Sequence, residues 1–377
     1  MFSLYIHIPF CVRKCLYCDF LSGPCTEEMK EAYVRALLSE IRREAPFYAD
    51  RTVETIFFGG GTPSLLSEEQ LTGLMDCVRQ NFHIAGTAEI SMEMNPGTAT
   101  AEKIACMRQN GINRLSIGLQ SSSDECLKRL GRIHTFRQFE ECFRQARESG
   151  FSNINVDVMA ALPGQSLQDY EQTLHTVLSF EPEHISAYSL IVEEGTWFYE
   201  NRETLNLPDE DTDRRMYERT AELLAEQGYR RYEISNYARE GFACRHNLAY
   251  WKRTDYAGFG IGAASFVNGV RFCNTGSLER YLAMPCRKEQ VEPLSREDAM
   301  EEFMFLGLRC MEGISVQDFQ RQFGVSVEQI YGRSIRKMED EGLLKRSMPA
   351  LADEDEMLFL SKKGIDVSNY VFEHFLL

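Results

Sequence analysis

The sequence predicts an α/β protein: a partial (β/α)6 barrel followed by an α+β module that resembles a winged helix. First, β-rich and amphipathic helical stretches alternate from residue 3 to about 190, which is typical of a parallel sheet with right-handed crossovers. Second, residues 3 to about 190 contain six β-α units, fewer than the eight of a closed barrel. Third, the pattern changes after residue 295, where helical stretches dominate.

The predicted strands are short runs rich in β-branched and aromatic residues, and they cover residues 4–8, 53–58, 89–94, 114–119, 153–160 and 184–190. Amphipathic patterns predict helices between them, at 27–45, 67–82, 100–110, 136–149 and 167–180. Thr26 and Ser67, each with glutamates close behind, are typical helix starts, and Gly111 and Gly150 are typical stops. In a barrel of this kind we expect ligands at the carboxyl ends of the strands.

We divide the chain into a partial barrel (1–230), a β-rich extension or linker (231–294) and a C-terminal module (295–377). The module has helical patterns at 297–311, 315–322 and 326–341, then short β-rich pieces. A winged helix suggests DNA, but residues 296–346 hold eight Lys or Arg and ten Asp or Glu, and the whole chain has a net charge of −16. We therefore expect no nucleic-acid partner and a lid or docking role for the module.

The composition also bounds the compartment. Twelve cysteines among 377 residues do not make a disulfide scaffold, and thiolates that bind metal need a reducing environment. No secretory signal pattern opens the chain, and no apolar run is long enough to span a bilayer. We expect a cytoplasmic protein, with contact to a membrane partner left open.

Three cysteines, Cys11, Cys15 and Cys18, follow the first predicted strand at the spacing C-x3-C-x2-C. Three thiolates on one loop can hold three corners of a cubane iron–sulfur cluster and leave its fourth iron open to another ligand. The alternative is a zinc site in which His7 or Cys25 supplies the fourth ligand. A third interpretation is three unrelated buried cysteines.

This spacing after a first strand resembles the signature of the radical S-adenosylmethionine enzymes, and the aromatic Tyr17 before the third cysteine fits the same pattern. The resemblance implies a [4Fe-4S] cluster whose open iron binds the amino and carboxylate groups of S-adenosylmethionine. It also implies that an electron from the cluster cleaves the sulfonium to methionine and a 5'-deoxyadenosyl radical.

A glycine-rich turn, Gly59-Gly60-Gly61-Thr62-Pro63, directly follows the second predicted strand. Glycines let the backbone approach a ligand closely, although tight β-α turns often need them for steric reasons alone. The turn lacks the lysine of a phosphate-binding P-loop and the spacing of a dinucleotide fingerprint. In the family that the chain resembles, a turn at this place contacts the amino group of S-adenosylmethionine, which assigns Gly60, Gly61 and Thr62 to the cofactor.

Polar residues near the ends of later strands complete the candidate site. Taken alone, each would more often be a surface group or a helix cap. S-adenosylmethionine needs acceptors for its ribose hydroxyls, which Glu93, Gln120 and Asp157 can supply, and donors for its carboxylate, which Arg132 can supply. Together these residues match the pattern of the family that the chain resembles. Tyr5 matches a position whose hydroxyl contacts the nucleotide side.

The resemblance narrows to one group. The motifs Tyr-Ile-His-Ile-Pro-Phe-Cys, GGGTP, EMNP, GLQS, LGRIH and LPGQ are similar to those of the oxygen-independent coproporphyrinogen III dehydrogenases. Two features depart from the dehydrogenase: Phe20 stands where it has a fourth cysteine, and only ten residues precede Cys11. Both departures resemble the sister group, the radical S-adenosylmethionine haem chaperones of the HemW type.

The segment His246-Asn-Leu-Ala-Tyr250-Trp251, preceded by Cys244, resembles the H-N-x-x-Y-W motif of those chaperones. In that group the histidine is implicated in haem binding, and a neutral imidazole is a good ligand for haem iron. Tyr250 and Trp251 could stack on a porphyrin face, and Cys244 is either an inert thiol or a second ligand. The alternative from the residues alone is a core turn in which His246 bonds to backbone and Trp251 packs.

The resemblance therefore implies a chaperone that holds a [4Fe-4S] cluster and S-adenosylmethionine, binds haem and passes it to haem-requiring respiratory proteins. The alternative hypothesis is an enzyme that oxidatively decarboxylates coproporphyrinogen III to protoporphyrinogen IX. The sequence leaves open whether the chain forms a homodimer.

Overall fold

The computed structural model describes residues 2–347 and 355–377, and most of the strands in those ranges belong to one curved sheet. The sheet has twelve strands in the described ranges, in the order β12-β11-β10-β9-β1-β2-β3-β4-β5-β6-β8-β7. Its central six strands are all parallel: β1 (Phe2–Ile8), β2 (Thr52–Gly60), β3 (His83–Met94), β4 (Arg114–Gln120), β5 (Ile154–Ala160) and β6 (His184–Ser189). The predicted partial (β/α)6 barrel is confirmed, and β3 begins six residues earlier than expected.

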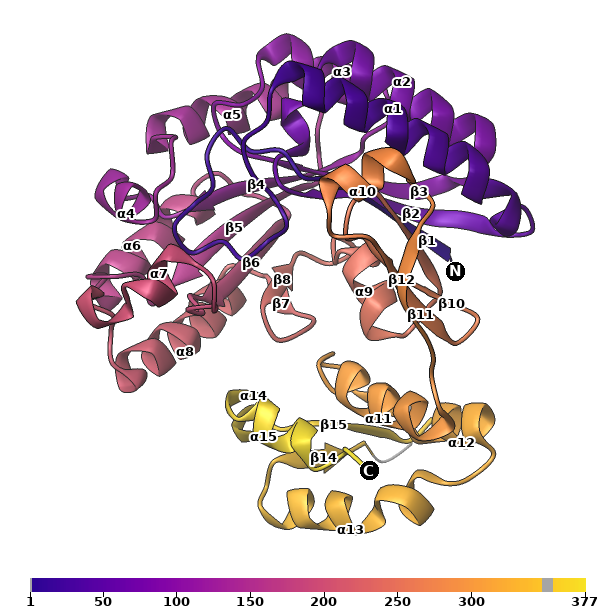
Figure 1. Ribbon diagram of the computed structural model, residues 1–377. Helices are drawn as coiled ribbons and strands as arrows, with labels where there is room; N and C mark the ends of the chain where they lie inside the picture. The colour runs from indigo at the N-terminus through magenta and orange to yellow at the C-terminus, as the bar shows by residue number, and fades with distance from the viewer. Residues whose placement is uncertain (1, 348–354) are drawn as a thin grey trace.

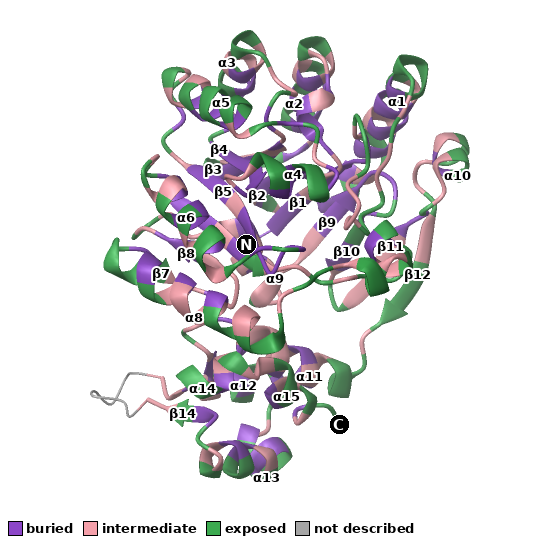
Figure 2. Cartoon of the chain, turned by 90° about the vertical axis from the view of Figure 1, so that its left-hand side faces the viewer, coloured by how far each residue is buried: buried purple, intermediate pink, exposed green. Residues whose placement is uncertain are grey.

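Helices cover the convex face of the sheet, as Figure 1 shows. Their order in the chain is α1 (Glu27–Glu44), α2 (Glu68–Asn81), α3 (Ala101–Gln109), α4 (Asp124–Arg129), α5 (Phe136–Glu148) and α6 (Leu167–Leu178). Figure 2 shows that these helices bury the side that faces the sheet and expose the other. Their apolar stripes and the strands form one continuous core, so the concave face remains for ligands.

Both edges of the sheet are extended by strands that were not predicted one by one, although residues 231–294 were expected to form a β-rich extension or linker. After α7 (Trp197–Glu200) and α8 (Glu210–Glu226), β7 (Arg230–Arg231) and β8 (Asn236–Ala238) add antiparallel strands beside β6. At the other edge β9 (Tyr256–Phe259) pairs parallel with β1, and β10 (Ala264–Val267), β11 (Val270–Asn274) and β12 (Lys288–Pro293) continue antiparallel. Helices α9 (Arg245–Trp251) and α10 (Leu278–Ala283) lie within this second extension.

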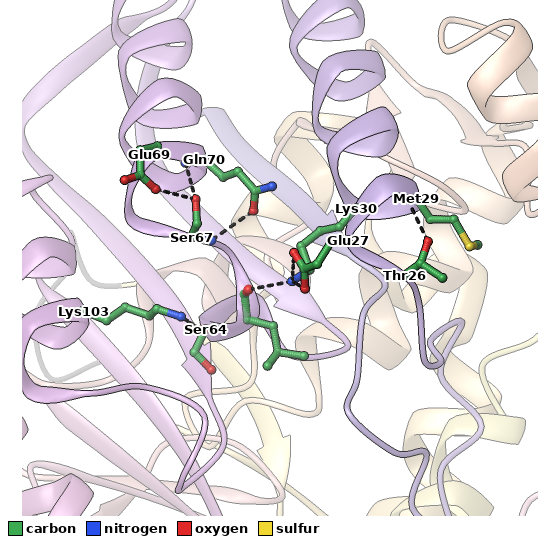
Figure 3. A network of polar contacts seen from close by, with 10 residues as sticks. Thr26, Glu27, Met29, Lys30, Ser64, Ser67, Glu69, Gln70 and Lys103 are labelled. Carbon is green, nitrogen blue, oxygen red and sulfur yellow. Dashed lines mark hydrogen bonds and ion pairs between the residues drawn. The ribbon is translucent and has the colours of Figure 1, made fainter.

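Side-chain caps determine where the first helices begin. Thr26 accepts a hydrogen bond from the backbone N–H of Met29 at the start of α1. Ser67 and Gln70 form a reciprocal capping box at the start of α2 (Figure 3). Such caps satisfy N–H groups that have no partner within the helix.

Two lysines fix the segment that joins β2 to α2 (Figure 3). The Lys30 ammonium donates to the carboxylate of Glu27 and to the carbonyl of Leu65, 3.2 Å away. The Lys103 ammonium donates to the carbonyl of Ser64 at 3.1 Å. Because these carbonyls come directly after the glycine-rich turn, helices α1 and α3 hold that turn in place.

The C-terminal module has its own hydrophobic core and lies below the sheet in Figure 1. Its elements follow the order of a winged helix: α11 (Arg296–Gly307), β13 (Ile314–Ser315), α12 (Val316–Phe323), α13 (Val327–Asp340), β14 (Leu344–Arg346) and β15 (Met357–Leu360), with α14 (Lys362–Asp366) and α15 (Ser368–Glu373) at the end. Three strands form its sheet in the order β13-β15-β14 within the described residues. Helix α11 ends at Gly307, four residues before the predicted end.

Within residues 2–347 and 355–377, no helix combines the length and the apolar character that crossing a membrane would require.

Candidate functional site

A cavity of about 610 Å³ opens on the concave side of the sheet. The residues predicted for cluster and cofactor lie along its wall, although they come from distant parts of the chain: Tyr5, Cys11, Cys15, Cys18, Gly60, Gly61, Glu93, Gln120, Arg132, Asp157 and His246. Thr62, the remaining predicted residue, lies behind the wall, where its hydroxyl contacts Cys11. A cavity at the carboxyl ends of parallel strands is the usual ligand site of such folds.

The loop between β1 and α1 carries the three cysteines over this cavity. It is closed on itself by the Cys11 N–H, which donates to the carbonyl of Gly23 at 2.9 Å. It is held to the segment after α4 by the Leu16 N–H, which donates to the carbonyl of Leu130 at 3.0 Å. Tertiary contacts therefore position the cysteine loop.

Two of the sulfur atoms face hydrogen-bond donors. Thr62 Oγ1 lies 3.5 Å from Cys11 Sγ, and Arg132 Nη1 lies 3.8 Å from Cys15 Sγ. Both groups can donate a hydrogen bond to the sulfur atom that they face, and the thiolate is the form of cysteine that binds metal. Burial raises the pKa of the Cys18 thiol, so binding an iron atom would have to displace its proton.

The cysteine spacing predicts either an iron–sulfur cluster or a zinc ion. In the described part of the chain, no group of three or more Cys, His, Asp or Glu residues is close enough together to hold one metal ion. In a cubane each thiolate binds a different iron, so the sulfurs lie farther apart than around zinc. His7, a fourth zinc ligand in the alternative interpretation, has Nδ1 3.0 Å from the Tyr5 hydroxyl and Nε2 2.9 Å from the carbonyl of Leu21.

The glycine-rich turn packs directly against the cysteine loop. The Gly61 N–H donates to the carbonyl of Ile8 at 2.8 Å, and the Thr62 N–H to that of Phe10 at 2.7 Å. A Cβ on Gly61 would lie 2.7 Å from the carbonyl oxygen of Phe10. Gly60 has a φ of 110°, in the region that favours glycine. The glycines are thus needed to bring the turn against the cysteine loop.

Two carboxylates line the cavity, Glu93 on β3 and Asp157 on β5. Glu93 Oε2 accepts a hydrogen bond of 3.0 Å from the Gly60 N–H, and burial together with the charge of Asp157 raises the pKa of Glu93 to about 8. Burial also raises the pKa of Asp157, although Asn155 donates to it at 2.7 Å. Clustered carboxylates with raised pKa values are typical of a binding site for a cationic ligand.

The Arg132 guanidinium is fixed by its Nη2, which donates to Asn95 Oδ1 at 2.7 Å and to the carbonyl of Gly118 at 2.5 Å. Its Nε is buried without a partner among the described residues. Asn95 in turn donates to Thr62 Oγ1 at 2.9 Å, so one chain of hydrogen bonds joins Arg132, Asn95, Thr62 and Cys11. A buried cation with a free donor can hold a ligand carboxylate.

Gln120 is held in an unusual backbone conformation at the end of β4. Its φ is 72°, and the register between β4 and β5 shifts at this point. A residue other than glycine in this region costs about 1–3 kcal/mol. The bulge keeps the Gln120 side chain on the cavity wall, where it accepts a hydrogen bond from the Tyr188 hydroxyl at 3.3 Å.

Sequence reasoning missed several residues of the cavity wall, notably Arg114, Asn95 and Tyr188. Arg114 begins β4 and is 2% exposed, and its Nε has no partner among the described residues. An arginine at the start of a strand is usually a surface residue, so the sequence did not indicate that Arg114 lies in the cavity wall. Asn95 belongs to the EMNP motif, but only the fold shows that it bridges Arg132 and Thr62.

His246 lies at the base of the cavity, 1% exposed. Thr55 Oγ1 donates to Ser3 Oγ, so it accepts from His246 Nδ1–H at 2.8 Å. His246 Nε2 is then the acceptor for the Tyr250 hydroxyl at 2.9 Å. Burial lowers the pKa of His246 to about 3, so the ring is neutral and both nitrogens are engaged.

The cysteine before this motif is deeply buried as well. Cys244 Sγ lies 3.5 Å from Glu89 Oε1, and burial raises the pKa of its thiol to about 12. Glu89 also accepts the N–H groups of Arg245 and His246. Cys244 is therefore a protonated thiol at the start of α9.

Comparison with known proteins identifies the family. Residues 5–177 match the Radical SAM superfamily, and residues 294–367 match the HemN C-terminal domain. The chain is 36% identical over 379 residues to the heme chaperone HemW of Lactococcus lactis, covering 100% of this chain and 97% of the relative. It is 37% identical over 383 residues to that of Bacillus subtilis, covering 100% and 99%.

The chain belongs to the HemW family of radical S-adenosylmethionine proteins. Membership of the superfamily implies a [4Fe-4S] cluster and S-adenosylmethionine as cofactors. The fold agrees with that of a solved structure, the coproporphyrinogen III oxidase HemN of Escherichia coli. That structure has a TM-score of 0.85 and 24% sequence identity, and the match covers 99% of this chain and 89% of that one.

Proposed function

We propose that this protein is a haem chaperone that holds a [4Fe-4S] cluster and S-adenosylmethionine in the first cavity, binds haem, and delivers it to haem-requiring respiratory proteins. The observation that carries the proposal is full-length similarity to proteins named heme chaperone HemW. Gathering of the predicted polar residues around one cavity supports the cofactor part of it.

In this proposal Cys11, Cys15 and Cys18 bind three irons of the cluster. The cluster supplies an electron that can cleave S-adenosylmethionine. The protein's own groups position that cofactor, and Arg132 binds its carboxylate. Glu93, which the sequence assigned to the nucleotide side, lies beside the glycine-rich turn, so we assign it to the amino group instead. Gln120, Asp157 and Tyr5 provide polar contacts for the nucleotide.

The charges of the wall suit this ligand. S-adenosylmethionine brings a sulfonium and an ammonium to a cavity that already holds two carboxylates of raised pKa. A bound cation favours the ionised form of Glu93, so binding would lower the pKa of that carboxyl. The attraction between the ionised carboxylates and the bound cation then contributes to affinity.

The motif from His246 to Trp251, which we propose for haem binding, lies on α9. His246 is the residue that we propose for haem contact, and its two hydrogen bonds restrict how it can act. To reach iron itself, His246 would have to release Tyr250 or Thr55. As it stands, the imidazole orients the Tyr250 hydroxyl.

The alternative function is oxidative decarboxylation of coproporphyrinogen III. Phe20 argues against this alternative. The dehydrogenase that the sequence resembles has a fourth cysteine at this position, whereas this chain has a phenylalanine whose side chain is 60% exposed. Anaerobically reconstituted protein should be incubated with coproporphyrinogen III, S-adenosylmethionine and reductant, and separately titrated with haem. We expect stable haem binding and no protoporphyrinogen, and formation of protoporphyrinogen would overturn the chaperone proposal.

A variant pair tests the proposed contact. We expect His246→Ala to weaken haem binding, whereas His175→Ala, on the exposed face of α6, should leave it unchanged. Equal haem affinity in both variants would remove His246 from the proposal. A cytoplasmic location and the number of copies in the assembly are tested by fractionation and by sedimentation of the reconstituted protein.

A further inference from the structure

A second cavity of about 560 Å³ lies between the sheet extension, α9 and the C-terminal module. Figure 1 shows α9 beside β11 and above helix α11 in this region. Tyr5 and Tyr250 line both cavities, so these two side chains form the wall that separates them. A volume in this range is usual for a small-molecule site.

The walls of the second cavity are mainly aromatic and apolar. Trp251, Tyr256 and Phe266 line it from α9 and the sheet extension, and Phe305 and Leu306 line it from α11. Tyr256 packs edge-on against Tyr250, with ring centroids 4.6 Å apart. Such surfaces suit a flat aromatic ligand, because ring faces offer broad contact with little loss of rotamer freedom.

The same cavity carries an excess of positive charge. Arg253 Nε and Arg271 Nη1 both bind the buried carboxylate of Glu302, at 3.1 and 2.8 Å. Two guanidinium groups thus face one carboxylate, and both lie over the ring of Phe266. The net positive charge favours an anion in the cavity.

Two donors in this wall have no protein partner. Among the residues that the structure describes, Arg271 Nε and Trp251 Nε1 are buried without a hydrogen bond. A buried donor without a partner is costly and calls for an explanation. A ligand with carboxylate groups would supply acceptors to such donors.

We propose that this second cavity is the haem site, with the macrocycle against Trp251, Tyr256 and Phe266 and a propionate on Arg271. This assignment rests on the proposed haem-chaperone function. Phe305 and Leu306 of the C-terminal module form one side of the site. The module would therefore have to move away from the sheet for haem to leave. His246 does not line this cavity, so the part in haem binding proposed for it is indirect: it positions Tyr250, whose hydroxyl donates to His246 Nε2.

A cavity-filling variant tests the location. Ala264 lines the second cavity and is otherwise exposed, so Ala264→Trp can fill the cavity without disturbing the core. Ala225→Trp, on the exposed face of α8, adds the same side chain elsewhere and is the control. We expect Ala264→Trp to weaken haem binding at least tenfold in an absorption titration, while Ala225→Trp binds as the wild type does.

A ligand analogue tests the carboxylate contact. Haem dimethyl ester lacks both propionate charges, so the wild type should bind it more weakly than haem. Arg271→Ala should bind haem as weakly as the wild type binds the ester, and should discriminate little between the two. Arg144→Ala, on the exposed surface of α5, should discriminate as the wild type does.

Each outcome decides the inference. If the wild type binds no haem, the proposed function fails and this inference fails with it. If the wild type binds haem and Ala264→Trp binds it equally well, the function stands and the second cavity is not the site. Thermal unfolding and S-adenosylmethionine binding of every variant show whether the fold and the first cavity remain intact, and a variant that fails there is replaced by Ala264→Phe.

Discussion

Replacing Gly61 by alanine should damage the cluster site through the backbone alone. The new Cβ would lie 2.7 Å from the carbonyl oxygen and 2.8 Å from the amide nitrogen of Phe10, whereas an ordinary contact begins at 3.4 Å. Since both atoms are backbone, the cysteine loop must move by about 0.7 Å. That shift strains two hydrogen bonds, Gly61 N–H to Ile8 and Thr62 N–H to Phe10, worth about 1 kcal/mol each.

We therefore expect Gly61→Ala to lower the free energy of unfolding by about 2–3 kcal/mol and to reduce the iron bound after anaerobic reconstitution. Urea denaturation of the cluster-free protein measures the first effect, and iron and sulfide analysis measures the second. Gly73→Ala in α2 is the matched control, because its Cβ would meet no atom within 4 Å; it should stabilise the helix by about 0.5–1 kcal/mol. Wild-type stability and iron content in Gly61→Ala would refute the close packing of turn and loop.

Three further variants test other parts of the site and fold. Arg132→Lys keeps the charge but loses the fork that reaches Asn95 and Gly118, so we expect S-adenosylmethionine to bind at least about tenfold more weakly in equilibrium dialysis; unchanged binding would contradict the role of Arg132. Gln120→Gly should change the unfolding free energy by less than about 1 kcal/mol, since relief of strain offsets the flexibility of glycine, yet it should weaken cofactor binding; a large loss of stability would mean that Gln120 is mainly structural. Burial raises the pKa of Glu40 to about 7, so the folded protein binds this proton more tightly than the unfolded chain and stability falls as the pH rises from about 4.5 to 7. Glu40→Gln should remove about 3 kcal/mol of that pH dependence in urea titrations at several pH values, and an identical slope in the wild type and the variant would show that the carboxyl is not protonated.

The parallel core could be predicted from the sequence because each of its elements has a local signal. Thr26 and Ser67 form the predicted caps, and the six strands alternate with helices of clear apolar periodicity. The short edge strands β7 and β8 could not be predicted, since they have only two and three residues, and residues 231–294 were expected to be β-rich only as a whole. Such short strands depend on a neighbouring edge rather than on their own composition.

The same distinction applies to the site. Cysteine spacing and glycine-rich turns are local patterns, so the sequence identified Cys11 and Gly60 directly. Arg114 and Tyr188 become part of the cavity only because strands from different parts of the chain lie side by side. The two hydrogen bonds of His246 also arise from tertiary contacts, with Thr55 on β2 and Tyr250 one turn further along α9. The motif therefore predicted where His246 lies, but not that its imidazole is buried with both nitrogens in hydrogen bonds.

The vacant iron of a three-cysteine cluster is the central claim of this account, and electron paramagnetic resonance of the reduced, reconstituted protein tests it most directly. We predict the signal of a reduced [4Fe-4S] cluster that changes when S-adenosylmethionine is added, and loss of that signal when Cys15 is replaced by serine. A signal that does not respond to S-adenosylmethionine, or a protein that binds one zinc ion in place of iron and sulfide, would contradict the account.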